Sequence, residues 1–187
     1  MSVSALGITV TGMRRALVAA LVAVGASMSL GACGSSIAPS TWATTVCQSL
    51  TPWRATISTL NQTAQTEMAT AKTPQDTRTH LVALLSGAQQ ATEKARGAVA
   101  DAGVPDVQGG AVIEKRFVAS LASARDAYAR AATSIAALPM SDADTFYSGV
   151  TATMSTLNAD YAKSGVDTDA LASPELQSDF AKVAACR

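Results

Sequence analysis

The chain has few of the side chains that catalytic and metal sites usually require. Among its 187 residues there is one histidine, aromatic residues make up 4% and charged residues 15%. A single histidine excludes a metal centre built from several imidazoles, and a Ser-His-Asp triad would have to include His80. We therefore expect no catalytic residues, no cofactor and no metal site, in a protein that is not an enzyme.

Neither basic nor acidic side chains are in excess. The 14 basic and 14 acidic side chains cancel to a formal net charge of zero. Binding of nucleic acid requires a concentrated basic face, which gives such proteins a clear excess of lysine and arginine. We therefore expect no nucleic-acid partner.

The chain also lacks an apolar run long enough for a typical membrane span. Arg14 and Arg15 precede an uncharged run that ends at Leu30, whereas a spanning helix requires about 18 or more apolar residues. A short apolar run between basic residues and small residues is typical of a secretory signal peptide. We assign residues 1–32 to a signal peptide, and a permanent transmembrane helix is the alternative.

The end of this leader carries a lipidation motif. Leu30-Gly31-Ala32-Cys33 resembles the bacterial lipobox, in which a signal peptidase cuts before the cysteine. The resemblance implies a diacylglyceryl group on the sulfur of Cys33 and an acyl chain such as palmitate on the new amino terminus. Two or three chains form a durable anchor, because each buried methylene contributes about 0.8 kcal/mol. The alternative is an ordinary secretory signal with a coincidental cysteine.

The start of the leader leaves two points open. Residues 1–12 carry no charge, so a conventional leader would begin at Met13 rather than Met1. The arginine pair is also compatible with twin-arginine export, although we favour the general export route.

Two cysteines remain once Cys33 is lipidated. Cys47 and Cys186 form an even pair in a chain that leaves the cytoplasm, which predicts a disulfide between them. The alternative, two free redox-active thiols, is disfavoured because no Cys-x-x-Cys spacing lowers either thiol pKa. A bridge would tie the ends of the mature chain together and contribute at most about 5 kcal/mol by chain-entropy models.

The rest of the chain predicts helices. Residues 33–40 are small and polar apart from Ile37 and Pro39, and we expect them to form a lipidated tether. Residues 41–187 carry apolar positions at helical spacing. The clearest stripe consists of Ile113, Phe117, Leu121, Ala124, Tyr128, Ala131, Ile135 and Leu138.

Breaking residues divide this domain. Thr51-Pro52 is predicted to break the first run and leave a short helix that carries Cys47. Gly103-Val104-Pro105 and Gly165 are predicted to end later helices, since glycine adopts the left-handed conformation that follows a helix.

Capping residues mark the other helix starts. Thr73-Pro74 and Ser173-Pro174 each place proline at the first helical position. Ser141 with Asp144 is predicted to cap the fourth long helix.

Together these signals predict an all-α fold. We expect an up-and-down antiparallel helical bundle of four long helices plus short N- and C-terminal helices. Alanine occupies many stripe positions, which favours close packing and a solid core over a ligand cavity.

Several further residues have both a structural and a functional interpretation. We predict His80 to be a surface residue at the edge of the solvated face, and Trp42 and Trp53 to seal one end of the bundle rather than form an exposed aromatic pair. The connector before Gly110 is predicted to join two helices, with an anion site beside Lys115 as the alternative.

Two closely spaced pairs of aspartates also have both a structural and a functional interpretation. Asp142 and Asp144 are predicted to belong to a helix start, and Asp167 with Asp169 is too short a motif for a calcium loop. Asp126 and Arg130 are predicted to form a pair four residues apart on one helix.

Several short motifs occur together along the mature chain. They are the lipobox, the Trp42–Cys47 start, Trp53, the Gly103–Gly110 connector, Leu138-Pro139, and Ser173–Leu176 before a terminal cysteine. In this combination the chain resembles small helical envelope lipoproteins of actinobacteria. The resemblance implies a fold and a location and brings no catalytic residue with it.

We therefore expect a membrane-anchored cell-envelope lipoprotein on the outer face of the cytoplasmic membrane, acting as a non-enzymatic helical interaction or scaffold module. Its partners would be the membrane, through the N-terminal lipid, and an unidentified envelope protein or ligand. The alternative is a carrier of an apolar ligand or envelope lipid, in which Met68, Met154 and Leu85 line an adaptable gap. A hydrolase that uses His80 is the weakest option, because no G-x-S-x-G motif is present.

Overall fold

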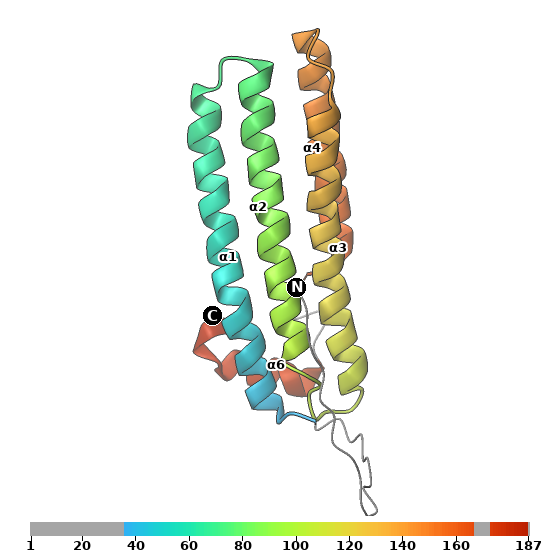
Figure 1. Ribbon diagram of the computed structural model, residues 1–187. Coiled ribbons are helices and arrows are strands. Elements are labelled where there is room, and N and C mark those ends of the chain that lie inside the picture. The colour runs from blue at the N-terminus through green and yellow to red at the C-terminus, as the bar shows by residue number, and fades with distance from the viewer. Residues whose placement is uncertain (1–35, 167–172, 187) are drawn as a thin grey trace, which may run out of the picture. The chain divides into compact units, whose positions relative to one another are not determined.

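The computed structural model describes residues 36–166 and 173–186 (Figure 1). The chain divides into two units, Met1–Cys33 and Gly34–Arg187, and every described residue belongs to the second. The predicted signal peptide, Cys33, Asp167 and Asp169 lie outside the described residues. Within the described ranges all regular structure is helical apart from one isolated bridge, which confirms the all-α class.

The described residues form four long helices and a short one. These are α1 (Pro39–Thr70), α2 (Pro74–Asp101), α3 (Gly110–Ala137), α4 (Ala143–Ser164) and α6 (Pro174–Lys182), followed by the 3-10 turn η1 (Ala184–Cys186). Consecutive long helices run antiparallel and pack on each other (Figure 1). α4 packs mainly on α3 and meets α2 at few positions, while α6 and η1 pack against α1.

The predicted break at Thr51-Pro52 is wrong, because α1 continues through Pro52. A proline inside a helix costs about 3 kcal/mol through its missing N–H and its steric clash. Burial of the apolar residues on both sides of the proline offsets this cost, since Leu50 is 1% exposed and Trp53 9%. The expected short N-terminal helix is therefore the first part of α1.

Helix α2 begins with the predicted cap. Thr73 and Asp76 form a capping box, in which each side chain accepts a hydrogen bond from the other residue's backbone N–H, both at 3.1 Å. Hydrogen bonds from the Thr73 side chain and the Lys72 backbone lower the pKa of the Asp76 carboxyl. Ser173 caps α6 in a similar way by accepting from the Leu176 N–H at 3.3 Å.

The cap of α4 differs from the prediction. Asp142, not Ser141, caps this helix, because its Oδ1 accepts the Thr145 N–H at 2.7 Å. Asp142 immediately precedes the first helical residue, where a carboxylate also faces the positive helix end. Gly165 ends α4 in the left-handed conformation, as predicted, with φ of 63°.

Trp42 is the centre of the core at one end of the molecule. Its side chain is fully buried, its ring packs edge-on against Phe117 at 5.4 Å, and it also contacts Phe180 at 6.0 Å. The Trp42 Nε1–H donates to the Gly103 carbonyl at 2.8 Å. The prediction that the tryptophans are core residues is confirmed, and the exposed aromatic pair is wrong.

Trp53 extends this core toward the middle of α1. Its Nε1–H donates at 3.0 Å to Oγ1 of Thr92 on α2, and that hydroxyl in turn donates at 2.7 Å to the Ala88 carbonyl. Both polar groups of the pair are thereby satisfied inside the helix interface.

The predicted stripe of α3 faces the core. Six of its residues are buried and two are half-buried, namely Tyr128 and Leu138. Beyond the tryptophans, a second apolar cluster joins α2, α3 and α4, and it consists of Leu81, Leu85, Ala127, Ala131, Ala132, Ile135 and Leu157.

The connector between α2 and α3 forms backbone hydrogen bonds with Ile37, which precedes α1. Gly103 ends α2 with φ of 75°, as predicted. Ile37 donates its N–H to the Val104 carbonyl and accepts the Asp106 N–H, both at 2.8 Å. Ile37, within the residues expected to form a lipidated tether, therefore pairs with the folded domain.

An ion-pair network links α2 and α3. Glu93 accepts from Arg96 on its own helix at 2.6 Å and from Arg125 on α3 at 2.7 Å, and Arg125 also contacts Asp126 at 2.7 Å. The predicted pairing of Asp126 with Arg130 is wrong. Arg130 instead reaches Asp160 on α4 at 2.8 Å, because α4 packs along this side of α3.

The Trp53–Thr92 hydrogen bond leads to a prediction on stability. Thr92→Val should lower the free energy of unfolding by about 1 to 3 kcal/mol, because it leaves the Trp53 N–H buried without an acceptor. Thr92→Ser keeps the hydroxyl and should cost less. Urea unfolding of both variants measures the difference, and equal stability of the two would contradict the assigned role of the hydroxyl.

The network around Glu93 leads to a prediction on pH. Hydrogen bonds from Arg96 and then Arg125 lower the pKa of Glu93 from its ordinary value of 4.5 to about 2. Because the folded-state pKa is the lower one, the stabilisation is present above pH 4.5 and is lost as the pH falls toward 2. Glu93→Gln should therefore lower Tm at neutral pH and flatten the decline of Tm across that window.

Thermal melts at a series of pH values test this, with Glu114→Gln as the matched control. Glu114 is half-buried on α3 and has no ion pair within the described part of the chain. A decline in Tm that is equally steep in Glu93→Gln and the unsubstituted protein would contradict the assignment.

Candidate functional site

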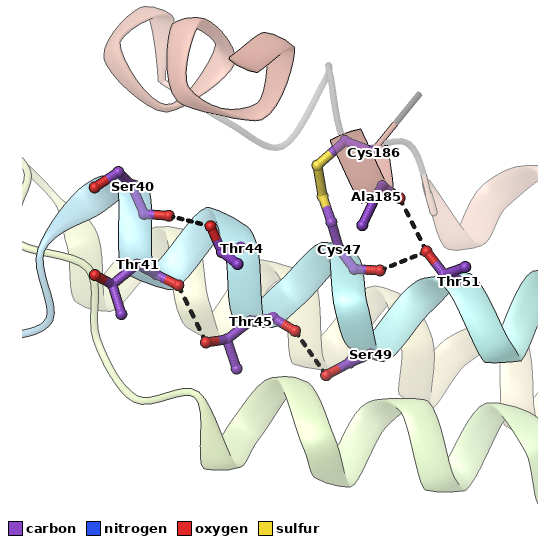
Figure 2. Close-up of a disulfide and its surroundings, with 9 residues drawn as sticks. All are labelled: Ser40, Thr41, Thr44, Thr45, Cys47, Ser49, Thr51, Ala185 and Cys186. Carbon is purple, nitrogen blue, oxygen red and sulfur yellow. Dashed lines mark hydrogen bonds between the residues drawn. A yellow bond between two sulfur atoms is a disulfide. The ribbon is translucent and has the colours of Figure 1, made fainter. Parts of the chain in front are cut away.

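The two predicted cysteines are joined. Cys47 of α1 and Cys186 of η1 form a disulfide with Cα atoms 5.1 Å apart, inside the range of about 4.4 to 6.8 Å that such a bond allows (Figure 2). They are separated by 139 positions in the sequence, so the bond ties the two ends of the folded domain together. Cys47 itself is 1% exposed.

Hydrogen bonds around the disulfide reinforce this junction. The Thr51 hydroxyl lies 2.9 Å from two carbonyl oxygens, those of Cys47 and Ala185, and so links η1 to α1 (Figure 2). The hydroxyls of Thr44, Thr45 and Ser49 donate to the carbonyls four residues earlier (Figure 2). The junction is therefore a structural feature of the helix end.

Helix α6 covers the end of the core beside the disulfide. Leu176 is fully buried and Phe180 is 5% exposed, and the Phe180 ring lies 6.1 Å from that of Phe117. The bond at Cys186 thus holds in place a short helix that completes the packing around Trp42.

A separate feature lies between α1 and α4. These two helices border a cavity of about 190 Å³ whose floor is formed by α2 and α3. The first half of its lining comes from α1 and α2, with aliphatic side chains of Ile57, Leu60, Leu84, Leu85 and Ala88.

The second half of the cavity lining comes from α3 and α4. It consists of Tyr128, Met154, Leu157 and Tyr161, and the amides of Asn61 and Asn158 complete the set. Among the residues that the structure describes, no charged side chain lines this cavity. A mainly apolar cavity with a few polar groups is the usual form of a small-molecule site.

The cavity exists because α4 packs mainly along α3 and leaves part of its apolar stripe uncovered. Met154 and Tyr161 are only half-buried, although Leu157 between them is buried. On the other side Gly87 lets α1 approach α2 closely, since a Cβ at this position would lie 2.8 Å from Leu60 Cδ2. Leu60 therefore packs toward α2, and space remains between α1 and α4.

Two tyrosines form the inner wall of this cavity. The rings of Tyr128 and Tyr161 lie 5.7 Å apart at an angle of 52°. Burial is the main cause that raises the pKa of both hydroxyls. Both therefore remain neutral hydrogen-bonding groups across the physiological range.

A shallower groove continues from the cavity along α1. It has a volume of about 480 Å³, and it shares Ile57 and Asn61 with the cavity. Arg54 lines this groove, and its guanidinium forms no ion pair within the described residues. The cavity and the groove thus border the same two residues, and Arg54 is the charged side chain among the described residues that line the groove.

The other sequence candidates have structural roles. His80 is half-buried, and its Nδ1 lies 3.0 Å from Oε2 of Glu67, so it joins α2 to α1 near their connecting turn. Asp142 and Asp144 belong to the helix start, as predicted. Within residues 36–166 and 173–186, no group of three or more metal-binding side chains comes together.

The sequence indicated the cavity only in part. Met154 and Leu85 line it as the carrier alternative expected, whereas Met68 packs against the second apolar cluster. The expectation of a solid core is wrong at this position. No single residue in the sequence signalled the position of the cavity, because that position depends on how α1 and α4 pack.

Comparison with protein-family models, with characterised proteins and with solved structures finds no significant match to this chain. None of the helices in the described part of the chain is both long and apolar enough to cross a membrane.

The disulfide leads to a third prediction. Reduction should lower Tm by several degrees, because the unfolded chain gains entropy when the long loop opens, while helix content measured by circular dichroism is largely kept. The Cys47→Ser/Cys186→Ser variant is the matched control and should not respond to the reductant. Alkylation of unreduced, denatured mature protein that modified both thiols would show that the bond is absent.

Proposed function

We propose that this protein is a lipid-anchored envelope lipoprotein on the outer face of the cytoplasmic membrane, whose helical domain is a non-enzymatic interaction module. The observation that carries the proposal is the lipobox-like sequence Leu30–Cys33, which directly precedes the helical domain. The proposal takes that domain to be an up-and-down antiparallel bundle. It also includes the inference that the chain is related to the actinobacterial envelope lipoproteins that its motifs resemble.

The way the domain begins supports the proposal. Ile37 is bonded to the α2–α3 connector and stands four positions after Cys33. Four extended residues span at most about 14 Å. A lipid on Cys33 would therefore hold the connector end of the domain close to the bilayer surface, together with α6 and the disulfide.

In this arrangement the turns at the other end face away from the membrane. The α3–α4 turn and the first turn of α4 expose Met140 and Tyr147, which are 38% and 42% exposed. These side chains would be accessible to an envelope partner. Crosslinking and pull-down in the native host would identify that partner.

The anchoring claim has a direct test. Cys33→Ala should move the protein from the membrane fraction to the soluble fraction, because it removes the only attachment site for the lipid. The Cys47→Ala/Cys186→Ala variant is the matched control and should stay with the membrane. Continued membrane retention of Cys33→Ala would overturn the claim.

The cavity between α1 and α4 favours a second candidate function, that of a carrier for an apolar ligand. The supporting observation is the uncharged lining of a space of about 190 Å³. Native mass spectrometry of protein extracted from its own membrane would test it. A ligand-free mass under mild conditions would count against a carrier.

A further inference from the structure

We propose that the cavity between α1 and α4 binds the alkyl chain of a single-chain fatty acid and that Arg54 binds its carboxylate. The inference rests on the carrier function proposed above and names its ligand class and its binding residues. It is independent of the lipid anchor.

The cavity fits an alkyl chain in size and polarity. Its aliphatic and tyrosine side chains come from all four long helices, and none of the described residues that line it is charged. An apolar cavity of about 150 Å³ admits a ligand the size of benzene, and this one holds about 190 Å³. Burial of the chain there removes apolar surface from water on both the ligand and Met154.

The polar side chains of the cavity suit the part of the ligand nearest its head. Asn61 on α1 and Asn158 on α4 both line the cavity, and neither side-chain amide has a hydrogen-bond partner among the described residues. The Tyr161 side chain is half-buried, and because burial raises the pKa of its hydroxyl, this group stays neutral. These groups offer hydrogen bonds without a charge that would oppose entry of the chain.

The groove on α1 supplies the complementary charge. Arg54 and Asn61 both line this groove, and seven residues of helix separate them by about 10 Å. A ligand whose chain fills the cavity can therefore extend its head past Asn61 to the guanidinium. Within the described ranges, no acidic side chain lines the groove and Arg54 has no ion pair. A carboxylate forms two parallel hydrogen bonds with such a group.

The charge contribution is tested by comparing dodecanoate with dodecanol. The purified full chain is first freed of co-purified lipid and then studied by isothermal titration calorimetry, with each ligand kept below its micelle concentration. We expect saturable binding of both dodecanoate and dodecanol. Dodecanoate should bind about 2- to 5-fold more tightly, the effect of one exposed ion pair. Arg54→Gln should abolish this preference. Arg116→Gln, which removes an exposed arginine outside the cavity and groove, should retain it.

The location of the chain is tested by filling the cavity. Met154→Trp on α4 and Ala88→Leu on α2 should each weaken dodecanoate binding at least 10-fold, because their side chains occupy the space of the ligand. Met154→Leu conserves volume and should bind nearly as well as the unsubstituted chain. Circular dichroism and Tm identify which filled variants have folded, and two independent filled positions keep the test decisive.

The outcomes separate this inference from the function on which it rests. Loss of binding in a folded filled variant, together with the Arg54 effect, supports the proposal. Saturable binding that the filled variants leave unchanged overturns the assigned cavity while a carrier function stands. Equal affinity for dodecanoate and dodecanol in the unsubstituted chain overturns the role of Arg54. Absence of saturable binding overturns both the inference and the carrier function.

Discussion

Trp42 lies where α1, the α2–α3 connector, α3 and α6 meet, and its burial holds these four segments together. The indole ring contacts Phe117 and Phe180, and its N–H is satisfied by the Gly103 carbonyl. The disulfide one turn further along α1 then fixes the segment that carries Phe180. In a chain with 4% aromatic residues, much of the large apolar surface is concentrated at this end.

The rest of the domain depends on this closed end and is packed less completely. Toward the middle, small side chains such as Ala88 and Gly87 let helices approach in some places and leave space in others. α4, which packs mainly along α3, does not cover α1, and the cavity forms between them. A rigid end and an incompletely filled middle suit a module that is held at one end and binds a ligand or partner elsewhere.

Local signals predicted much of the fold, because helix caps and apolar spacing are properties of neighbouring residues. The cap at Thr73, the end at Gly165 and the stripe of α3 follow from such signals. The disulfide was predictable from the number of cysteines together with the export that the leader predicts. Pro52 shows the limit of this reasoning, since a local cost is outweighed by burial of Trp53. The position of the cavity was not predictable, because this position depends on how α4 packs relative to α1.

The proposed anchoring of this domain by a lipid on Cys33 can be tested by intact-mass analysis of the protein from its native membrane. We expect a chain that begins at Cys33 and carries the added mass of a diacylglyceryl group, with further acylation of the amino terminus. A chain that begins at Cys33 without added lipid, or that retains residues 1–32, would contradict it.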